Sequence, residues 1–147
     1  MKIICQNKKA SHEYFIEKTY EAGIKLKGTE IKAIRMNKVN INDSYIQIKN
    51  NKIIIINMDI AKYDKGNIFN HDEKRDRELL MHKKEIIKLQ NYKNQDGYSL
   101  IPLKVYFKDA LVKVEVGLCK GKKNYDKRES LKEKDINKRL QKINRYY

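Results

Sequence analysis

The sequence has few cysteines and no long apolar run, which excludes several classes of protein. Its only two cysteines, Cys5 and Cys119, lie near opposite ends of the 147 residues. Zinc sites and disulfide frameworks require closely spaced or numerous cysteines, so we expect two buried, free thiols. No eighteen apolar residues follow one another, and the apolar stretch at the start is too short for a signal peptide. We therefore expect a cytoplasmic protein that does not cross a membrane.

The sequence also lacks the short motifs of common catalytic sites. It contains no His-Glu-x-x-His, Walker A loop, Gly-x-Gly-x-x-Gly or serine-centred elbow. A paired-histidine nuclease is the alternative enzyme interpretation, but the spacing of His12, His71 and His82 does not require two of them to converge. Four carboxylates could hold magnesium, but the start of a helix explains them better: Asp72, Glu73, Asp76 and Glu78. We expect no enzyme activity, no catalytic residue, no cofactor and no metal.

Negative charge is scarce at the end of the chain. The segment 120–147 contains eleven Lys or Arg and four Asp or Glu, so it contributes +7 of the formal net charge of +15. Basic side chains release condensed counterions from phosphates, which makes RNA or DNA the favoured partner class. A membrane surface is a weaker alternative because only this tail offers an apolar helix face.

Several segments show the two-residue alternation of strands. From Tyr14 to Leu26 the even positions are mostly apolar, which predicts one long half-buried strand that ends before Gly28. The segments 44–49 and 52–58 flank Asn50 and Asn51 and predict a hairpin. Two more strands are expected at 100–107 and 111–118, with Pro102 at an edge or a bulge.

Two segments show the three- to four-residue spacing of helices. Thr29 is a candidate N-cap for a helix of about two turns that ends near Lys38, with Asn37 in the left-handed conformation. A second helix is expected from an apolar stripe formed by Leu79, Leu80, Ile86, Ile87 and Leu89. The polar segment 63–76 is interpreted as a loop whose sequence is not required by the core.

These elements predict a mainly β (α+β) protein. Five or six antiparallel strands with two or three short helices favour a small antiparallel β-barrel that resembles an oligonucleotide-binding (OB) fold. We expect this body to span 1–119 and a basic tail to span 120–147. Ile136, Leu140, Ile143 and Tyr147 form one apolar stripe on the tail, which we expect to be disordered when free and helical when bound.

Tyrosines and two carboxylates are the remaining candidates for RNA contact. Most tyrosines lie on expected strands, where packing is the ordinary explanation, but Tyr125 follows the last strand and has no core to join. Glu21 and Glu30 could accept hydrogen bonds from base edges or 2′-hydroxyls. Ordinary surface groups are the simpler interpretation of these two carboxylates.

A series of motifs in order along the chain resembles the SsrA-binding protein (SmpB) family. The first half contributes Asn7-Lys8-Lys9-Ala10, Tyr20-Glu21-Ala22-Gly23, Gly28-Thr29-Glu30-Ile31-Lys32 and Asp43-Ser44-Tyr45. The second half contributes Asn70-His71-Asp72, Leu79-Leu80, Pro102-Leu103, Gly121-Lys122-Lys123 and Asp126-Lys127-Arg128. The resemblance is nearly collinear from Asn7 to the end of the chain.

The resemblance implies a non-enzymatic function in trans-translation. In that family the body binds the tRNA-like domain of transfer-messenger RNA (tmRNA, SsrA RNA) and replaces an anticodon stem-loop. The tail occupies the empty decoding site and mRNA channel of a stalled ribosome. The resemblance also implies indirect partnership with elongation factor Tu and alanyl-tRNA synthetase through tmRNA, and we expect a monomer.

The resemblance also implies which residues act. Its tmRNA-binding positions are Asn7, Glu21, Leu80 and Lys113, with His82 at a neighbouring variable position. Its decoding-site and tail positions are Gly121, Lys122, Lys123, Tyr125, Asp126, Lys127, Arg128, Ile136 and Ile143.

One departure from the family pattern bears on RNA binding. Glu78 stands where a basic residue is usual, which removes positive charge beside Leu80. The alternative function is that of a generic ribosomal or single-stranded RNA-binding barrel, which composition and fold fit equally well.

Overall fold

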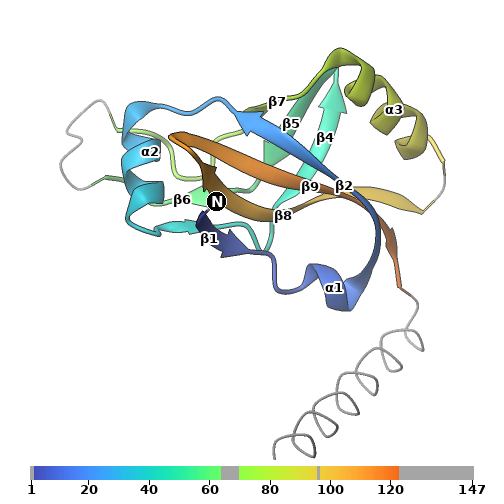
Figure 1. The fold of residues 1–147 in the computed structure, drawn as a ribbon, viewed down its shortest axis with the longest axis horizontal. Coiled ribbons are helices and arrows are strands. Elements are labelled where there is room, and N and C mark those ends of the chain that lie inside the picture. Colours follow the sequence, from blue (N-terminus) through green and yellow to red (C-terminus); the bar gives the residue numbers. More distant parts are fainter. Residues whose placement is uncertain (1, 64–69, 96, 123–147) are drawn as a thin grey trace, which may run out of the picture.

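The computed structural model describes residues 2–63, 70–95 and 97–122. The elements in chain order are β1 (Lys2–Gln6), α1 (Ala10–Glu13), β2 (Tyr14–Ile24), α2 (Gly28–Arg35), β3 (Val39–Asn40), β4 (Tyr45–Lys49), β5 (Lys52–Ile56), β6 (Asp59–Ile60), β7 (Arg77–Leu80), α3 (Lys83–Lys93), β8 (Tyr98–Lys108) and β9 (Leu111–Gly121). Figure 1 shows α2 and α3 at opposite ends of the curved sheet, with α1 below it.

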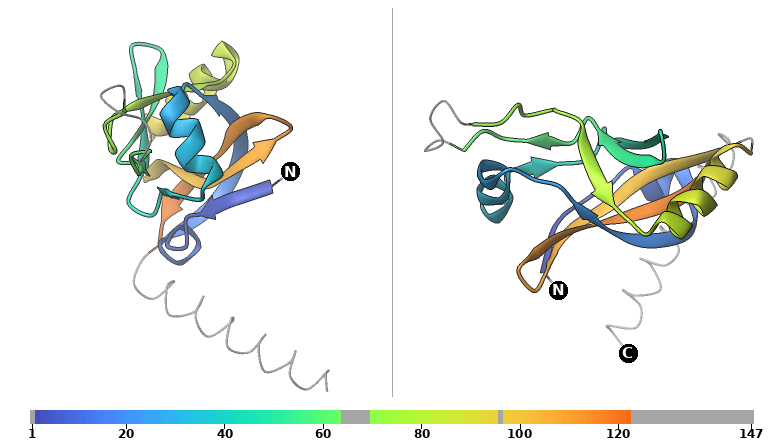
Figure 2. Two further views of the ribbon diagram at one scale, coloured as in Figure 1. Left: turned by 90° about the vertical axis from the view of Figure 1, so that its left-hand side faces the viewer. Right: turned by 90° about the horizontal axis from the view of Figure 1, so that it is seen from above.

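The main sheet is antiparallel and curls into a ring. Its strand order is β1-β8-β4-β5-β7-β2-β9, and β8 also pairs with β9. This extra pairing closes a circle of six strands, with β1 added outside β8; two views from other sides show the curvature (Figure 2). The closure between β4 and β8 is narrow, since only Ile46 and Leu100 pair there. The mainly β class with three short helices is confirmed, but the nine strands in the described residues exceed the five or six expected.

The predicted hairpin and the two predicted strands near the end of the body are confirmed, and their turns explain why. Asn50 and Asn51 connect β4 to β5 with φ of 51° and 62°, the left-handed pair that a tight two-residue turn needs. Asparagine tolerates positive φ better than most residues. In the second hairpin, Asp109 (φ 56°) turns β8 back into β9.

The long strand β2 is also confirmed, with one irregularity. Its register against β9 shifts between Ile16 and Lys18. The shift marks a bulge, and a bulge changes which side chains face inward. Ile16 is consequently 41% exposed, although simple alternation placed it on the half-buried face with Ala22.

The first predicted helix exists but begins differently. Lys27, not Thr29, is the N-cap of α2, and its backbone N–H donates to Glu30 Oε1 at 2.8 Å. Thr29 lies inside the helix and its hydroxyl pairs with His71 Nδ1 at 2.9 Å. Asn37 ends the helix with φ of 60°, as predicted.

The second predicted helix exists, but it begins later in the structure than the sequence indicated. Residues Arg77–Leu80 form strand β7, which pairs with β5 and β2, and α3 begins only after His82. Leu79 is buried and Leu80 is 48% exposed, which is the two-residue alternation of a strand. Strand pairing with distant partners therefore overrides the helical spacing of the leucines.

One residue of the polar segment before β7 is buried, which corrects the expectation of a loop whose sequence the core does not require. His71 is buried, and its Nε2 lies 2.8 Å from the carbonyl oxygen of Ile60. A carbonyl only accepts, so His71 Nε2 carries a proton. The explanation of the neighbouring carboxylates as a helix start is also wrong, since Glu78 lies in β7.

A buried ion-pair network fastens this segment to α2. Glu30 and Arg77 are both fully buried, and the carboxylate accepts hydrogen bonds from Arg77 and Arg75. Arg77 also donates to the carbonyl oxygens of Met58, Arg75, Asp72 and Glu73. Burial alone would raise the pKa of Glu30, but these partners together hold it below its usual value.

Close packing of β8 on β9 explains two other residues. The register shifts between Pro102 and Lys104, so the proline lies at a bulge as predicted. A Cβ on Gly117 would lie 2.8 Å from Leu103 Cδ1, so glycine permits this approach.

Cys119 is buried and Cys5 half-buried, and burial raises the pKa of both thiols to about 11. Both cysteines are free thiols in the described structure, and neither forms a reactive thiolate at neutral pH.

Candidate nucleic-acid interface

A row of paired residues crosses four strands on the outside of the ring. Leu80 in β7 pairs with Gly23 in β2, Gly23 pairs with Lys113 in β9, and Lys113 pairs with Tyr106 in β8. Directly paired residues of antiparallel strands present their side chains on one face. These four residues, which we name the Gly23 row, bring together an exposed leucine, a bare backbone position and a lysine.

Glu21 lies beside the Gly23 row on the same face of β2. Tyr106 donates its hydroxyl hydrogen to Glu21 Oε2 at 2.6 Å, and Lys108 Nζ lies 3.5 Å from Glu21 Oε1. The hydrogen bond from Tyr106, helped by the charges of Lys108 and Lys113, holds the pKa of Glu21 below its usual value. The side chain therefore presents a negative charge to solvent at neutral pH.

The structure thus brings three of the predicted RNA-binding residues together: Glu21, Leu80 and Lys113. His82 lies two residues beyond Leu80 as the exposed N-cap of α3. Glu78, the departure from the family pattern, pairs with Lys25 Nζ at 2.8 Å. Its negative charge beside Leu80 is therefore compensated within the protein.

Asn7, the fifth predicted RNA-binding residue, lies elsewhere. Its backbone N–H donates to Leu103 O at 2.8 Å and its side-chain amide to Pro102 O at 3.2 Å. These partners lie three to four residues from Tyr106 along β8, which corresponds to about 10–13 Å at strand spacing. The structure does not place Asn7 with the Gly23 row.

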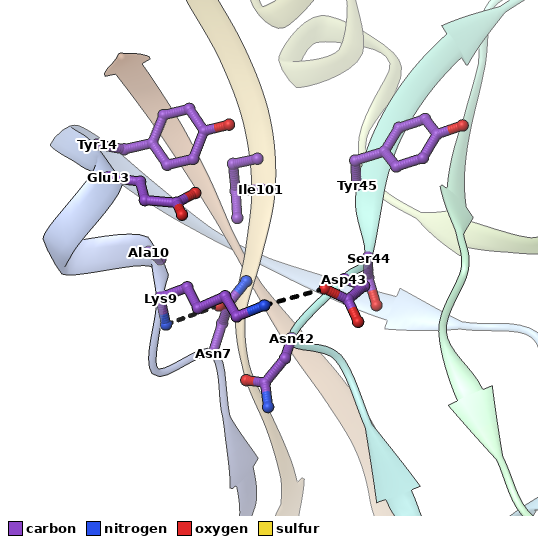
Figure 3. Close-up of a pocket in the computed structure, with 10 residues that line it drawn as sticks. All are labelled: Asn7, Lys9, Ala10, Glu13, Tyr14, Asn42, Asp43, Ser44, Tyr45 and Ile101. Atoms are coloured by element: carbon purple, nitrogen blue, oxygen red, sulfur yellow. Dashed lines mark hydrogen bonds and ion pairs between the residues drawn. The ribbon is translucent and has the colours of Figure 1, made fainter. Parts of the chain in front are cut away.

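Asn7 instead lines a cavity of about 330 Å³ beside α1. Figure 3 shows Tyr14 and Tyr45 on either side of Ile101, with Lys9 reaching toward Asp43. The Lys9 Nζ to Asp43 Oδ1 distance is 3.3 Å. The charged lining residues are one lysine and two carboxylates, counting Glu13, so this cavity is not a phosphate site.

The base of the tail is held against α1. Gly121 pairs with Tyr14 at the end of β9, and the backbone N–H of Lys122 donates to Glu13 O at 2.8 Å. Lys122 Nζ lies 4.9 Å from the centre of the Phe15 ring, a cation–π contact. A Cβ on Gly121 would meet nothing within 4 Å, so packing does not explain this glycine.

The remaining predicted tail residues lie outside the described residues. They are Lys123, Tyr125, Asp126, Lys127, Arg128, Ile136 and Ile143.

Strand β9 connects the Gly23 row to the base of the tail. Lys113 lies near its beginning and Gly121 at its end. Eight residues at strand spacing correspond to about 26 Å. Strand β9 therefore holds the Gly23 row and the base of the tail at a fixed distance from each other.

No catalytic or metal centre is found in the described part of the chain. No group of three or more His, Cys, Asp or Glu is placed there to hold a metal ion. His71 is buried with both ring nitrogens engaged, which makes it inaccessible to an RNA phosphate. Of the described helices, none is long and apolar enough to cross a membrane.

Comparison with known proteins decides the family. The family model described as "SmpB protein" matches residues 4–146. This chain belongs to the SmpB family. An "SsrA-binding protein" of Caldanaerobacter subterraneus subsp. tengcongensis is 55% identical, over 97% of this chain and 90% of that relative. One of Bacillus subtilis is 54% identical, over 95% and 90%.

A solved structure extends the similarity to three dimensions. It is described as "tmRNA-SmpB: a journey to the center of the bacterial ribosome". The two chains share 43% sequence identity and a TM-score of 0.68, over 82% of this chain and 85% of that one. SmpB proteins bind RNA and are not enzymes, so the expectation of no enzyme activity is confirmed.

Sequence reasoning assigned no RNA-binding role to Tyr106, Gly23 or Lys108. The alternation of Lys104, Tyr106 and Lys108 in β8 was a usable signal, because it places the tyrosine on the polar face of a strand. Nothing in the sequence, however, indicated that this tyrosine would lie opposite Glu21, 85 residues away.

Proposed function

We propose that this protein binds the tRNA-like domain of tmRNA and delivers it to stalled ribosomes for trans-translation. The observation that carries the proposal is the convergence of Glu21, Leu80 and Lys113 on one outward face in a chain of the SmpB family. Lysine neutralises phosphate, leucine offers an apolar contact, and the carboxylate accepts hydrogen bonds from base edges or 2′-hydroxyls. This combination suits a folded RNA loop better than a regular duplex, whose deep groove excludes side chains.

The body replaces the anticodon stem-loop that tmRNA lacks. It acts as an OB-type barrel in the cytoplasm, as a monomer, and contacts elongation factor Tu and alanyl-tRNA synthetase only through tmRNA. His82 contributes an RNA contact beside the Gly23 row, and Asn7 contributes a separate contact near α1. The separation of the Gly23 row from Lys122 along β9 supports a division of labour between RNA binding and the ribosome.

The basic tail occupies the empty decoding site and mRNA channel and becomes helical there. Gly121, Lys122, Lys123, Asp126, Lys127 and Arg128 act at the decoding centre, Tyr125 stacks there, and Ile136 and Ile143 lie on the tail helix. The tail can bind only where the channel is free of mRNA, so coupled folding and binding selects stalled ribosomes. In this proposal the body spans 1–119 and the tail 120–147.

Competition binding tests the function. The purified protein is titrated against labelled tRNA-like domain with excess ordinary tRNA at near-physiological salt, which suppresses unspecific phosphate attraction. We expect tight binding that survives the competitor and weakens at least tenfold with Glu21→Ala. Glu17→Ala is the matched control, since Glu17 lies in the same strand and accepts a hydrogen bond from Tyr98 at 2.9 Å. Equal binding to tRNA would refute the proposal.

A generic RNA-binding barrel is the alternative function. It predicts that Asp126→Ala is harmless or improves binding, because a carboxylate repels phosphate. The proposed function predicts that this variant binds the tRNA-like domain normally and loses peptide tagging on stalled ribosomes. A reconstituted tagging assay distinguishes the two.

A further inference from the structure

Two residues of β8 restrict the position of the Glu21 carboxylate. Tyr106 is 5% exposed, so neighbouring side chains hold its ring in place, while its hydroxyl reaches Glu21 Oε2 at 2.6 Å. Lys108 approaches the other oxygen, Oε1, at 3.5 Å. An exposed glutamate normally samples several rotamers, whereas this one is held by a rigid donor and a cation.

The Glu21 carboxylate keeps acceptor positions that its two partners in the protein do not use. A carboxylate has four acceptor positions, two on each oxygen. Tyr106 uses one on Oε2 and Lys108 uses one on Oε1. At least one position therefore remains on each oxygen, and the two oxygens can accept from two adjacent donors on a partner.

The charges around Glu21 keep it available to such a partner. Glu115 pairs with Glu21 in the register of β2 and β9, but Lys104 Nζ lies 3.7 Å from Glu115 Oε2. Lys108 and Lys113 are the cations that lower the pKa of Glu21. Glu21 is thus an anion surrounded by lysines. The lysines attract an RNA strand, while the carboxylate oxygens repel its phosphates.

The absence of a side chain at Gly23 lets Leu80 lie close to the backbone of β2. Gly23 has no side chain between Leu80 and Lys113, and a Cβ there would lie 3.3 Å from Leu80 Cβ. Leu80 is 48% exposed beside it. A planar base can therefore pack against the exposed apolar surface of Leu80 on the face that carries Glu21.

We propose that Tyr106 is a positioning residue that aims Glu21 at the Watson–Crick edge of an unpaired guanine. Guanine offers two adjacent donors, N1–H and the 2-amino group, which match one free acceptor position on each carboxylate oxygen. Uracil offers only a single N–H, and phosphate offers no donor. This inference rests on the proposed function, since it names the RNA group that the same face recognises.

The first experiment removes only the hydroxyl. Tyr106→Phe keeps the buried ring, and we expect about tenfold weaker binding to the tRNA-like domain. Carboxyl NMR of the free variant should show the pKa of Glu21 risen toward 4.5, because its main hydrogen bond is lost. Tyr98→Phe is the matched control, since Tyr98 makes the same kind of bond to Glu17 in the same two strands. Circular dichroism and thermal unfolding verify that both variants fold.

A double variant separates positioning from general destabilisation. If Tyr106 acts through Glu21, Tyr106→Phe should weaken binding less than twofold in a Glu21→Gln background. Equal tenfold losses in both backgrounds would overturn the positioning role. An unchanged Glu21 pKa in Tyr106→Phe would overturn it as well.

The second experiment identifies the RNA group. Each unpaired loop guanosine of the tRNA-like domain is replaced singly by inosine, which lacks the 2-amino donor. We expect one position to weaken wild-type binding about tenfold and Glu21→Gln binding less than twofold. No position with this difference would overturn the guanine assignment. Wild-type protein without preference for the tRNA-like domain would instead overturn the proposed function itself, so the two failures are distinguishable.

Discussion

The ammonium group of Lys122 is fixed to the carbonyl oxygen of Ser11, at 2.9 Å. The first residue after β9 is thereby attached to α1, and its backbone N–H bonds to Glu13 as well. Glu13 also lines the cavity beside Asn7. The direction in which the chain leaves the ring is therefore set by α1.

This attachment predicts a separable effect of Lys122. Lys122→Ala should reduce peptide tagging in a reconstituted system at least tenfold, because the tail would leave the ring in an undefined direction. Affinity for the tRNA-like domain should change less than twofold, since the Gly23 row is about 26 Å away. Lys120→Ala is the control, because it removes the same charge from a lysine whose ammonium group lies over the Tyr98 ring of β8, 4.7 Å from its centre. Equal tagging by both variants would contradict the role of α1.

Substitution of Gly23 should weaken RNA binding without preventing folding. A methyl group at Gly23 would project beside Leu80 Cβ at 3.3 Å, on the outer face. Gly23→Ala should change the free energy of unfolding by less than about 1 kcal/mol, because the residue lies in a strand with ordinary φ. Its affinity for the tRNA-like domain should fall about tenfold, as measured by the same competition titration.

Gly28 provides the matched control for that substitution. It is the first residue of α2, and a Cβ there meets nothing within 4 Å. Gly28→Ala should raise the free energy of unfolding by less than about 1 kcal/mol and leave affinity unchanged, because Gly28 lies at the helix start and not in its interior. Parallel losses of affinity in both variants would argue against a specific role of the Gly23 row.

The buried ion-pair network predicts a large effect on stability. Arg77→Ala leaves the Glu30 carboxylate buried with one charged partner fewer and releases the carbonyl oxygens of the segment before β7. Breaking a buried pair costs about 3–5 kcal/mol. Lys9→Ala should cost less than about 1 kcal/mol, because the Lys9–Asp43 pair is mostly exposed. Urea unfolding of the two variants measures the difference.

The same network predicts a pH dependence. The pKa of Glu30 is lower in the folded protein than its ordinary value of 4.5, so the ionised form stabilises the fold. This contribution is fully present above about 4.5 and is lost as the pH falls through the lower folded-state pKa. Urea unfolding of the wild type should show this loss at acid pH. Glu30→Gln should be less stable at pH 7 and lose less stability on acidification, and an identical pH slope would contradict the prediction.

Local chemistry determined the hairpins, the mainly β class and the end of α2 from the sequence alone. Paired asparagines at a turn and Asn37 after a helix act within a few residues, so their effect is readable without the fold. The apolar alternation of β9 likewise reports one buried face. The family motifs added the RNA-binding function, because they mark residues whose types the fold alone does not demand.

Only the tertiary structure decided the state of residues 77–80 and the composition of the interface. Leu79 and Leu80 fit a helix locally, but pairing with β5 and β2 makes them a strand. Glu21, Leu80, Tyr106 and Lys113 are distant in sequence, and their meeting depends on which strands pair and in which register. Register is set by packing summed over the whole ring, and a shift of one residue would turn these side chains inward.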